Sequence, residues 1–95
     1  MNRLDTEETG RITITDLGRL TQVLKCEYDA VVTSQGDGFW RVQFLLAGHT
    51  YMLGTVRGSI RRWRQLDAVI AFLQSNCPDS SQVRLQIGPW MFCRN

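Results

Sequence analysis

The sequence has one lysine, one histidine and two prolines in its 95 residues, and it has no long apolar run. A transmembrane helix needs about 18 or more consecutive apolar residues, so we do not expect the chain to cross a membrane. Asp5, Glu7 and Glu8 stand where a signal peptide would carry basic residues and an apolar block. These absences predict a soluble, cytoplasmic protein.

Cysteine is also sparse, and Cys26, Cys77 and Cys93 include no C-x-x-C pair. An odd and widely scattered set suits neither a disulfide framework nor a zinc site. His49, the single histidine, has no cysteine or acid nearby in the sequence to help it bind a metal or act as a general base. We therefore expect reduced thiols, no metal, no cofactor and no enzymatic activity.

Arginine dominates the charge. Ten of the eleven basic residues are arginine, and the net charge is +2. Residues 1–9 hold one arginine and three acids, whereas the remainder holds ten basic and six acidic residues and carries +4. Arginine makes bidentate contacts with phosphate or carboxylate, although biased codon usage in a GC-rich genome would give the same preference. The charge alone does not decide between these explanations.

The composition, 43% hydrophobic and 21% charged, fits one globular domain. Residues 1–10 are polar and cannot offset their ordering entropy by burial, so we expect a disordered tail there and a single α+β domain at residues 11–95. Apolar residues recur at helical spacing in residues 16–25 and 66–75, which predicts two helices. Whether residues 11–15 form a strand stays open.

Alternation of apolar and polar residues indicates the strands. The predicted strands are residues 28–33, 40–46, 51–55, 60–63 and 83–87. Turn residues between the first two predict a hairpin, and Gly88-Pro89 is expected to end regular structure. We expect an antiparallel sheet in the order α-β-β-β-β-α-β, with both helices packed on one face.

A cluster of four arginines is the strongest candidate for a binding function. Arg57, Arg61, Arg62 and Arg64 fall within eight residues that contain no acid. In a strand, Arg62 and Arg64 share one face, while Arg61 and Trp63 share the other. Such a ridge suits a nucleic-acid backbone, with Trp63 stacking on a base. The alternative is a solvated edge strand whose charges prevent aggregation, with Trp63 in the core.

The C-terminal segment is apolar, which is unusual for the end of a small domain. Either it folds back over the sheet, or it contacts a protein partner, such as a second copy in a homodimer. Trp90, Met91 and Phe92 are accordingly the candidate protein-contact residues.

A longer pattern resembles a known family. It reads Tyr51-x-Leu53-x-Thr55-x-Arg57-Gly58-x-x-Arg61-x-Trp63-Arg64-x-Leu66-Asp67-Ala68. With the preceding helix and strand, residues 16–87 resemble small partition-associated accessory proteins of bacterial plasmids and integrative elements. The resemblance implies an accessory role near DNA segregation or maintenance of a mobile element, and it supplies no catalytic residues.

Two functions follow from these observations. The first is a non-enzymatic accessory protein that binds a protein partner through a sheet edge or the Trp90 region. The alternative is a nucleic-acid-binding domain that uses the arginine-rich strand. Its order of helix, sheet and helix resembles double-stranded RNA-binding domains, but residues 65–68 lack the lysine-rich helix start that those domains use for phosphates.

Overall fold

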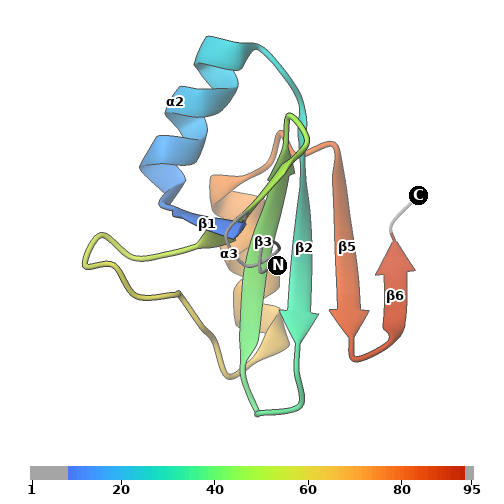
Figure 1. The fold of residues 1–95 in the computed structure, drawn as a ribbon. Helices are drawn as coiled ribbons and strands as arrows, with labels where there is room; N and C mark the ends of the chain where they lie inside the picture. Colours follow the sequence, from blue (N-terminus) through green and yellow to red (C-terminus); the bar gives the residue numbers. More distant parts are fainter. Residues whose placement is uncertain (1–8, 94–95) are drawn as a thin grey trace, which may run out of the picture.

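The computed structural model describes residues 9–93, which form an α+β fold (Figure 1). The elements are β1 (Thr9–Ile12), α2 (Ile14–Leu24), β2 (Tyr28–Ser34), β3 (Trp40–Leu46), β4 (His49–Leu53), α3 (Leu66–Asn76), β5 (Gln82–Ile87) and β6 (Trp90–Cys93). The α+β class is confirmed. So is the predicted hairpin, because β2 and β3 pair antiparallel along their whole length.

All six strands belong to one sheet in the order β1-β4-β3-β2-β5-β6. The sheet is mixed, because β1 runs parallel to β4 and β5 runs parallel to β2. The strictly antiparallel sheet that the sequence predicted is therefore wrong. The two helical connections are the reason, since a helix can carry the chain back across a sheet and return it in the same direction.

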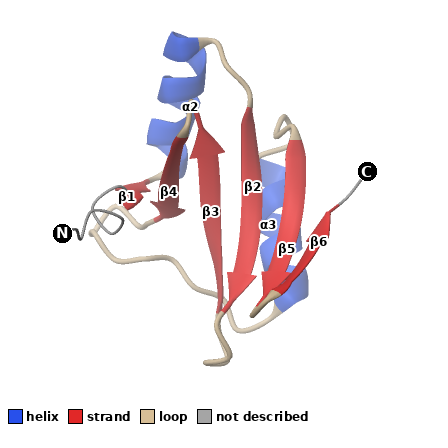
Figure 2. Ribbon diagram, turned by 45° about the vertical axis from the view of Figure 1, so that its right-hand side comes forward, coloured by secondary structure: helices blue, strands red, loops and turns tan. Residues whose placement is uncertain are grey.

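The core lies between the sheet and both helices. Ala30, Val32, Val42 and Phe44 point to this side and are completely buried, as the alternation along β2 and β3 requires. Leu17 of α2 and both Val69 and Leu73 of α3 belong to the same buried cluster. Figure 2 shows the two helices on the same side of the sheet, in agreement with the prediction.

The start of the described chain differs from the prediction. Thr9 and Gly10, which were expected in the tail, belong to β1, so the segment around Arg11 joins the sheet. Residues 1–8 of the expected tail lie outside the described residues. The helix begins earlier than predicted because the hydroxyl of Thr13 accepts a hydrogen bond from the Asp16 amide at 3.2 Å and caps it.

The predicted strand at residues 60–63 is absent as a regular element. Two isolated bridges replace it, one between Gly54 and Ile60 and one between Trp40 and Trp63. The reason is that β1 occupies the outer edge of β4, where this segment would have continued the meander. The arginine-rich residues therefore lie in an irregular crossing segment, residues 54–65.

Regular structure also continues past Gly88-Pro89, where it was predicted to end. Gly88 has a φ of 57°, which places it in the left-handed region at the first position of a two-residue turn. The turn brings β6 back alongside β5, from Ile87 opposite Trp90 to Arg84 opposite Cys93. The C-terminal segment thus folds back by joining the sheet edge (Figure 1).

Candidate functional site

The crossing segment is held to the sheet by backbone hydrogen bonds. Trp40 and Trp63 exchange two of them, at 2.7 and 2.9 Å, and the Arg61 amide donates to the Leu53 carbonyl at 2.9 Å. Within the segment, the Thr55 amide donates to the Ser59 carbonyl at 2.8 Å, and the Ser59 amide donates to the Thr55 hydroxyl at 3.2 Å. The arginines therefore project from a fixed backbone.

Arg62 and Arg64 converge on one aromatic ring. Their guanidinium carbons lie 4.3 and 5.2 Å from the centroid of Phe39, in the loop between β2 and β3. We call these three residues the Phe39 cluster. Phe39 was not among the predicted site residues, because nothing in the loop sequence indicates that the crossing segment would pack beside it.

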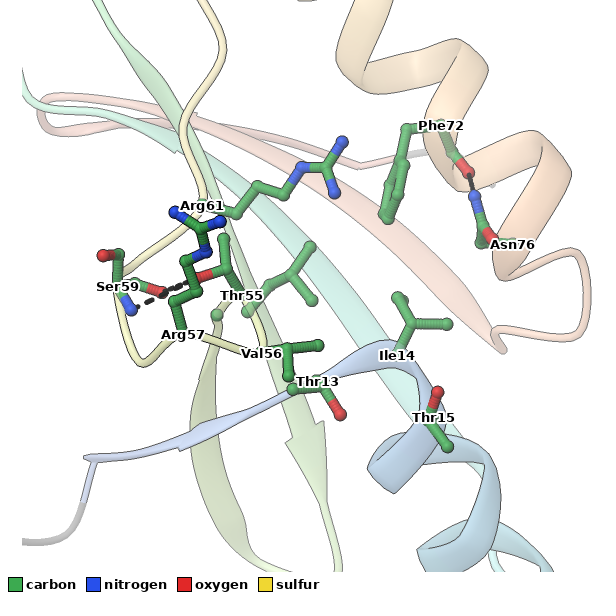
Figure 3. Close-up of a pocket in the computed structure, with 12 residues that line it drawn as sticks. Thr13, Ile14, Thr15, Thr55, Val56, Arg57, Ser59, Arg61, Phe72 and Asn76 are labelled. Carbon is green, nitrogen blue, oxygen red and sulfur yellow. Dashed lines mark hydrogen bonds between the residues drawn. The ribbon is translucent and has the colours of Figure 1, made fainter.

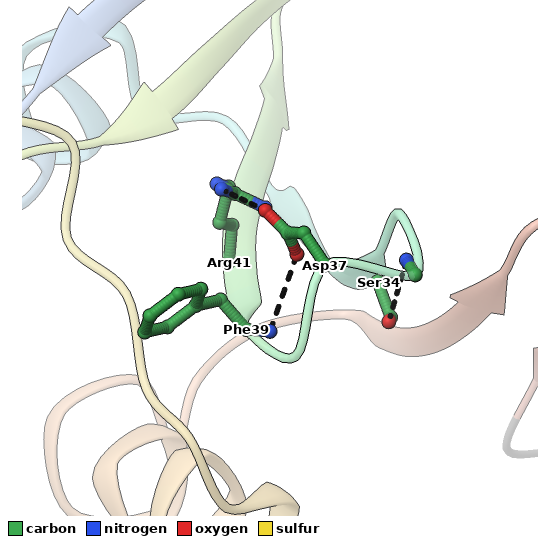
Figure 4. A network of polar contacts seen from close by, with 5 residues as sticks. Ser34, Asp37, Phe39 and Arg41 are labelled. Atoms are coloured by element: carbon green, nitrogen blue, oxygen red, sulfur yellow. Dashed lines mark hydrogen bonds and ion pairs between the residues drawn. The ribbon is translucent and has the colours of Figure 1, made fainter.

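The loop that carries Phe39 is itself ordered by Asp37. One carboxylate oxygen of Asp37 accepts from the Phe39 amide at 3.2 Å, and the other pairs with the Arg41 guanidinium at 2.7 Å (Figure 4). The Arg41 guanidinium lowers the pKa of the Asp37 carboxyl, so this carboxylate stays charged around neutral pH. The ring under Arg62 and Arg64 thus has a defined position.

Arg61 points away from the Phe39 cluster. Its guanidinium carbon lies 5.0 Å from the ring centroid of Trp63 and 4.9 Å from that of Phe72 on α3. Arg61 and Trp63 therefore share one side, and Arg62 and Arg64 share the other, as alternation predicted. Trp63 is half-buried against the core, so it packs in the core as well as supporting Arg61.

Arg57 and Arg61 line a hollow on the helix side, with a volume of about 690 Å³. Its other walls are the start of α2, the end of α3 and the loop after β4 (Figure 3). None of the acidic side chains of residues 9–93 lines it. The hollow could not be predicted from the sequence, because it is formed by three segments that are distant along the chain.

A fifth arginine, Arg11 of β1, lies along the same crossing segment. A Cβ atom added at Gly58 would stand 3.3 Å from a terminal nitrogen of Arg11, and one added at Gly54 would stand 2.6 Å from its Cδ. Gly54 is buried, and because it has no side chain, the Arg11 side chain can pass beside it. No sequence signal connects Arg11 with the later arginines.

Five arginines of this region have no ion-pair partner among the carboxylates of residues 9–93. Within residues 9–93, the ion pairs join Arg19 to Asp16, Arg41 to Asp37 and Arg84 to Asp29. None of Arg11, Arg57, Arg61, Arg62 and Arg64 takes part in an ion pair with a carboxylate of that range. The basic side chains form two groups around the crossing segment, one at Phe39 and one at the hollow.

The candidate protein-contact residues lie at the opposite edge of the sheet. Trp90 is 66% exposed and Met91 48% exposed in the edge strand β6. Phe92 occupies the β6 position opposite Leu85. The C-terminal segment therefore folds back and still presents a large aromatic side chain to solvent.

Other features give no sign of chemistry in the described residues. His49 is exposed, and within residues 9–93 no group of three or more histidine, cysteine or acidic side chains is placed to hold a metal ion. Burial raises the pKa of the Cys77 thiol, which keeps it protonated. No helix in the described part of the chain is long and apolar enough to cross a membrane.

Comparisons with known proteins identify no relative of this chain. No protein-family model matches the chain, and searches of curated proteins and of solved structures found no match. The resemblance to partition-associated proteins therefore stays a prediction.

Proposed function

We propose that this protein is a non-enzymatic accessory protein that binds nucleic acid through the Phe39 cluster. The observation that carries the proposal is the stacking of two guanidinium groups on one ring, with no carboxylate of residues 9–93 paired to either. A role in maintaining a mobile element is the biological setting that the resemblance implies.

The stacked arrangement suits phosphate binding for a physical reason. A guanidinium group that lies over an aromatic ring keeps its N–H donors in its own plane, free to bind an anion. Stacking also restricts a side chain that otherwise loses much conformational entropy on binding. Each phosphate neutralised by arginine releases condensed counterions, so binding should weaken as salt rises.

The test is a titration of labelled duplex DNA, duplex RNA and single strands at low and near-physiological salt. We expect salt-sensitive, saturable binding to at least one of these nucleic acids, and loss of that binding in Arg62→Glu/Arg64→Glu. The matched control is Arg19→Glu/Lys25→Glu on exposed positions of the α2 region, which changes the net charge equally. Equal loss in both variants would show a general charge effect and overturn the assignment, as would absence of binding by the wild type.

The exposed Trp90 favours a second candidate function, which is self-association. β6 carries no charged residue, and charges are a common means of preventing edge pairing. In the dimer that we propose, the β6 strands of two copies pair about a two-fold axis. This pairing buries Trp90 and gives the backbone groups at the sheet edge hydrogen-bond partners. Homodimerisation through β6 is the protein contact that this edge supports best.

A further inference from the structure

The hollow on the helix side is separate from the Phe39 cluster. Arg61 extends from the crossing segment toward Phe72, and Arg57 lies beside the start of the Arg61 side chain (Figure 3). Both arginines are exposed, and neither takes part in an ion pair with a carboxylate of the described residues. The hollow therefore combines two available positive charges with a concave surface.

Several polar groups of the hollow are already used within the protein. The Thr13 hydroxyl caps α2, the Thr55 hydroxyl is bonded to Ser59, and the Asn76 amide donates to the Phe72 carbonyl. The charged donors that line the hollow are Arg57 and Arg61. Stacking on Phe72 holds the Arg61 guanidinium while leaving its in-plane N–H groups able to donate.

Part of the wall of the hollow is apolar. Ile14, Leu53 and Phe72 all line it. A volume of about 690 Å³ lies in the range of sites that hold a small organic molecule. The combination of an apolar wall with two cations at one side favours an amphipathic anion over a bare ion.

We propose that this hollow binds a phosphate monoester of a small organic molecule, with the phosphate on Arg57 and Arg61 and the organic group against Ile14 and Phe72. A phosphate monoester carries a charge of roughly −1.5 to −2 at neutral pH, which matches two guanidinium groups. Arginine also offers paired donors in the geometry that phosphate oxygens accept. This ligand site goes beyond the proposed nucleic-acid function and uses different arginines.

Calorimetric titration with phenyl phosphate as the probe tests the site. We expect phenyl phosphate to bind, inorganic phosphate to bind more weakly, and phenol to show no binding. Arg57→Gln/Arg61→Gln should weaken phenyl phosphate at least tenfold, whereas the matched control Arg19→Gln/Lys25→Gln, with the same charge change at exposed positions of the α2 region, should leave it unchanged. No heat with phenyl phosphate, or equal weakening in the two variants, would overturn the proposal.

Backbone amide spectra give a second readout that does not depend on the heat of binding. Phenyl phosphate should shift the amide resonances of Ile14, Thr15 and Phe72, and shifts confined to the Phe39 loop would contradict the site. The two proposals fail separately, because each pair of arginine variants is measured with both phenyl phosphate and nucleic acid.

A competition experiment identifies the source of the monoester. Oligonucleotides with a 5′-phosphate or a 5′-hydroxyl are titrated against bound phenyl phosphate. Displacement by neither oligonucleotide supports a free small molecule. Displacement by the 5′-phosphate form alone would overturn the small-molecule ligand and assign the hollow to a nucleic-acid terminus.

Discussion

The guanidinium carbon of Arg62 lies 4.3 Å from the centroid of the Phe39 ring, and Arg64 approaches the same ring at 5.2 Å. Two positively charged guanidinium groups thus lie close to one aromatic ring, on a loop whose backbone is hydrogen-bonded to Asp37. If this arrangement serves binding, the ring should matter to nucleic-acid affinity even though it carries no charge.

Phe39→Leu tests this point because it removes the ring and keeps an apolar side chain. Each exposed cation–π contact contributes about 0.5–1 kcal/mol. Because both contacts already exist in the free protein, their loss acts through the lost positioning of the arginines, and we expect nucleic-acid affinity to fall by at most roughly thirtyfold. The dependence of affinity on salt should stay the same, since no phosphate contact is removed. Fluorescence anisotropy at several salt concentrations measures both quantities, and unchanged affinity would contradict a role for the ring.

Gly54→Ala tests the passage of Arg11 across the crossing segment. The new Cβ would meet Arg11 Cδ at 2.6 Å and the Ser59 carbonyl oxygen at 3.0 Å. Overpacking of this kind costs about 1–3 kcal/mol of unfolding free energy. Arg11→Ala in the same chain should recover part of the loss, as measured by urea denaturation in a double-mutant cycle. Strictly additive effects would show that the two residues do not interact.

Tyr28→Phe probes a partly buried hydrogen bond. The Tyr28 hydroxyl donates to an Asp79 carboxylate oxygen at 2.6 Å, and its loss should lower the free energy of unfolding by about 1–2 kcal/mol at pH 8. Urea denaturation measures this difference. Tyr51→Phe on β4 is the matched control, for which we expect a smaller change.

The same bond predicts a pH dependence. Burial of the Tyr28 hydroxyl is the main cause that raises its pKa above the ordinary value. The hydrogen bond that the hydroxyl donates to Asp79 raises the pKa further. The unfolded chain loses this proton near pH 10 while the folded chain retains it, so the stability contribution is complete below about pH 10 and declines above it. The decline is at most about 1.4 kcal/mol per pH unit for one proton. The wild type should therefore lose stability faster than Tyr28→Phe between pH 10 and 11, and parallel curves would rule this out.

Trp90→Arg tests self-association through β6. We expect the wild type to be a dimer and the variant to be a monomer, because the substitution removes the apolar contact of Trp90 and adds two like charges to the interface. Light scattering over a range of protein concentrations measures the mass. Val23→Arg is a suitable control, since Val23 is also apolar and 75% exposed but lies on α2. A wild type that stays monomeric would eliminate this second candidate.

Much of the local structure could be predicted from the sequence because local patterns carry it. The alternation in residues 40–46 and the helical spacing in residues 66–75 identify a strand and a helix almost to the residue. Alternation also separates Arg61 from Arg62 and Arg64, and this separation persists although the regular strand does not form. An extended backbone is sufficient to place these side chains on opposite sides. The bridge between Trp63 and Trp40 keeps the backbone extended there.

The candidate site was predicted only in part. The arginines could be found because they are adjacent in the sequence. Phe39, Phe72 and Arg11 could not, because each reaches the arginines through packing of a different element. The Gly88-Pro89 pair indicates a turn, but a turn can either end regular structure or begin a hairpin. The outcome depends on whether the edge of the preceding strand is free to pair with the residues that follow, as the edge of β5 is.

The sequence by itself determined the class of fold, the faces of the main strands and the excess of arginine. Periodicity is a local property, so it is sufficient to decide which side chains of an element face the core. Only the tertiary structure decided that β1 takes the edge of β4, that the arginine segment crosses as an irregular chain, and that its charges divide between Phe39 and the hollow. Strand order depends on competition between distant segments for the same sheet edge, and no local pattern records the outcome of that competition.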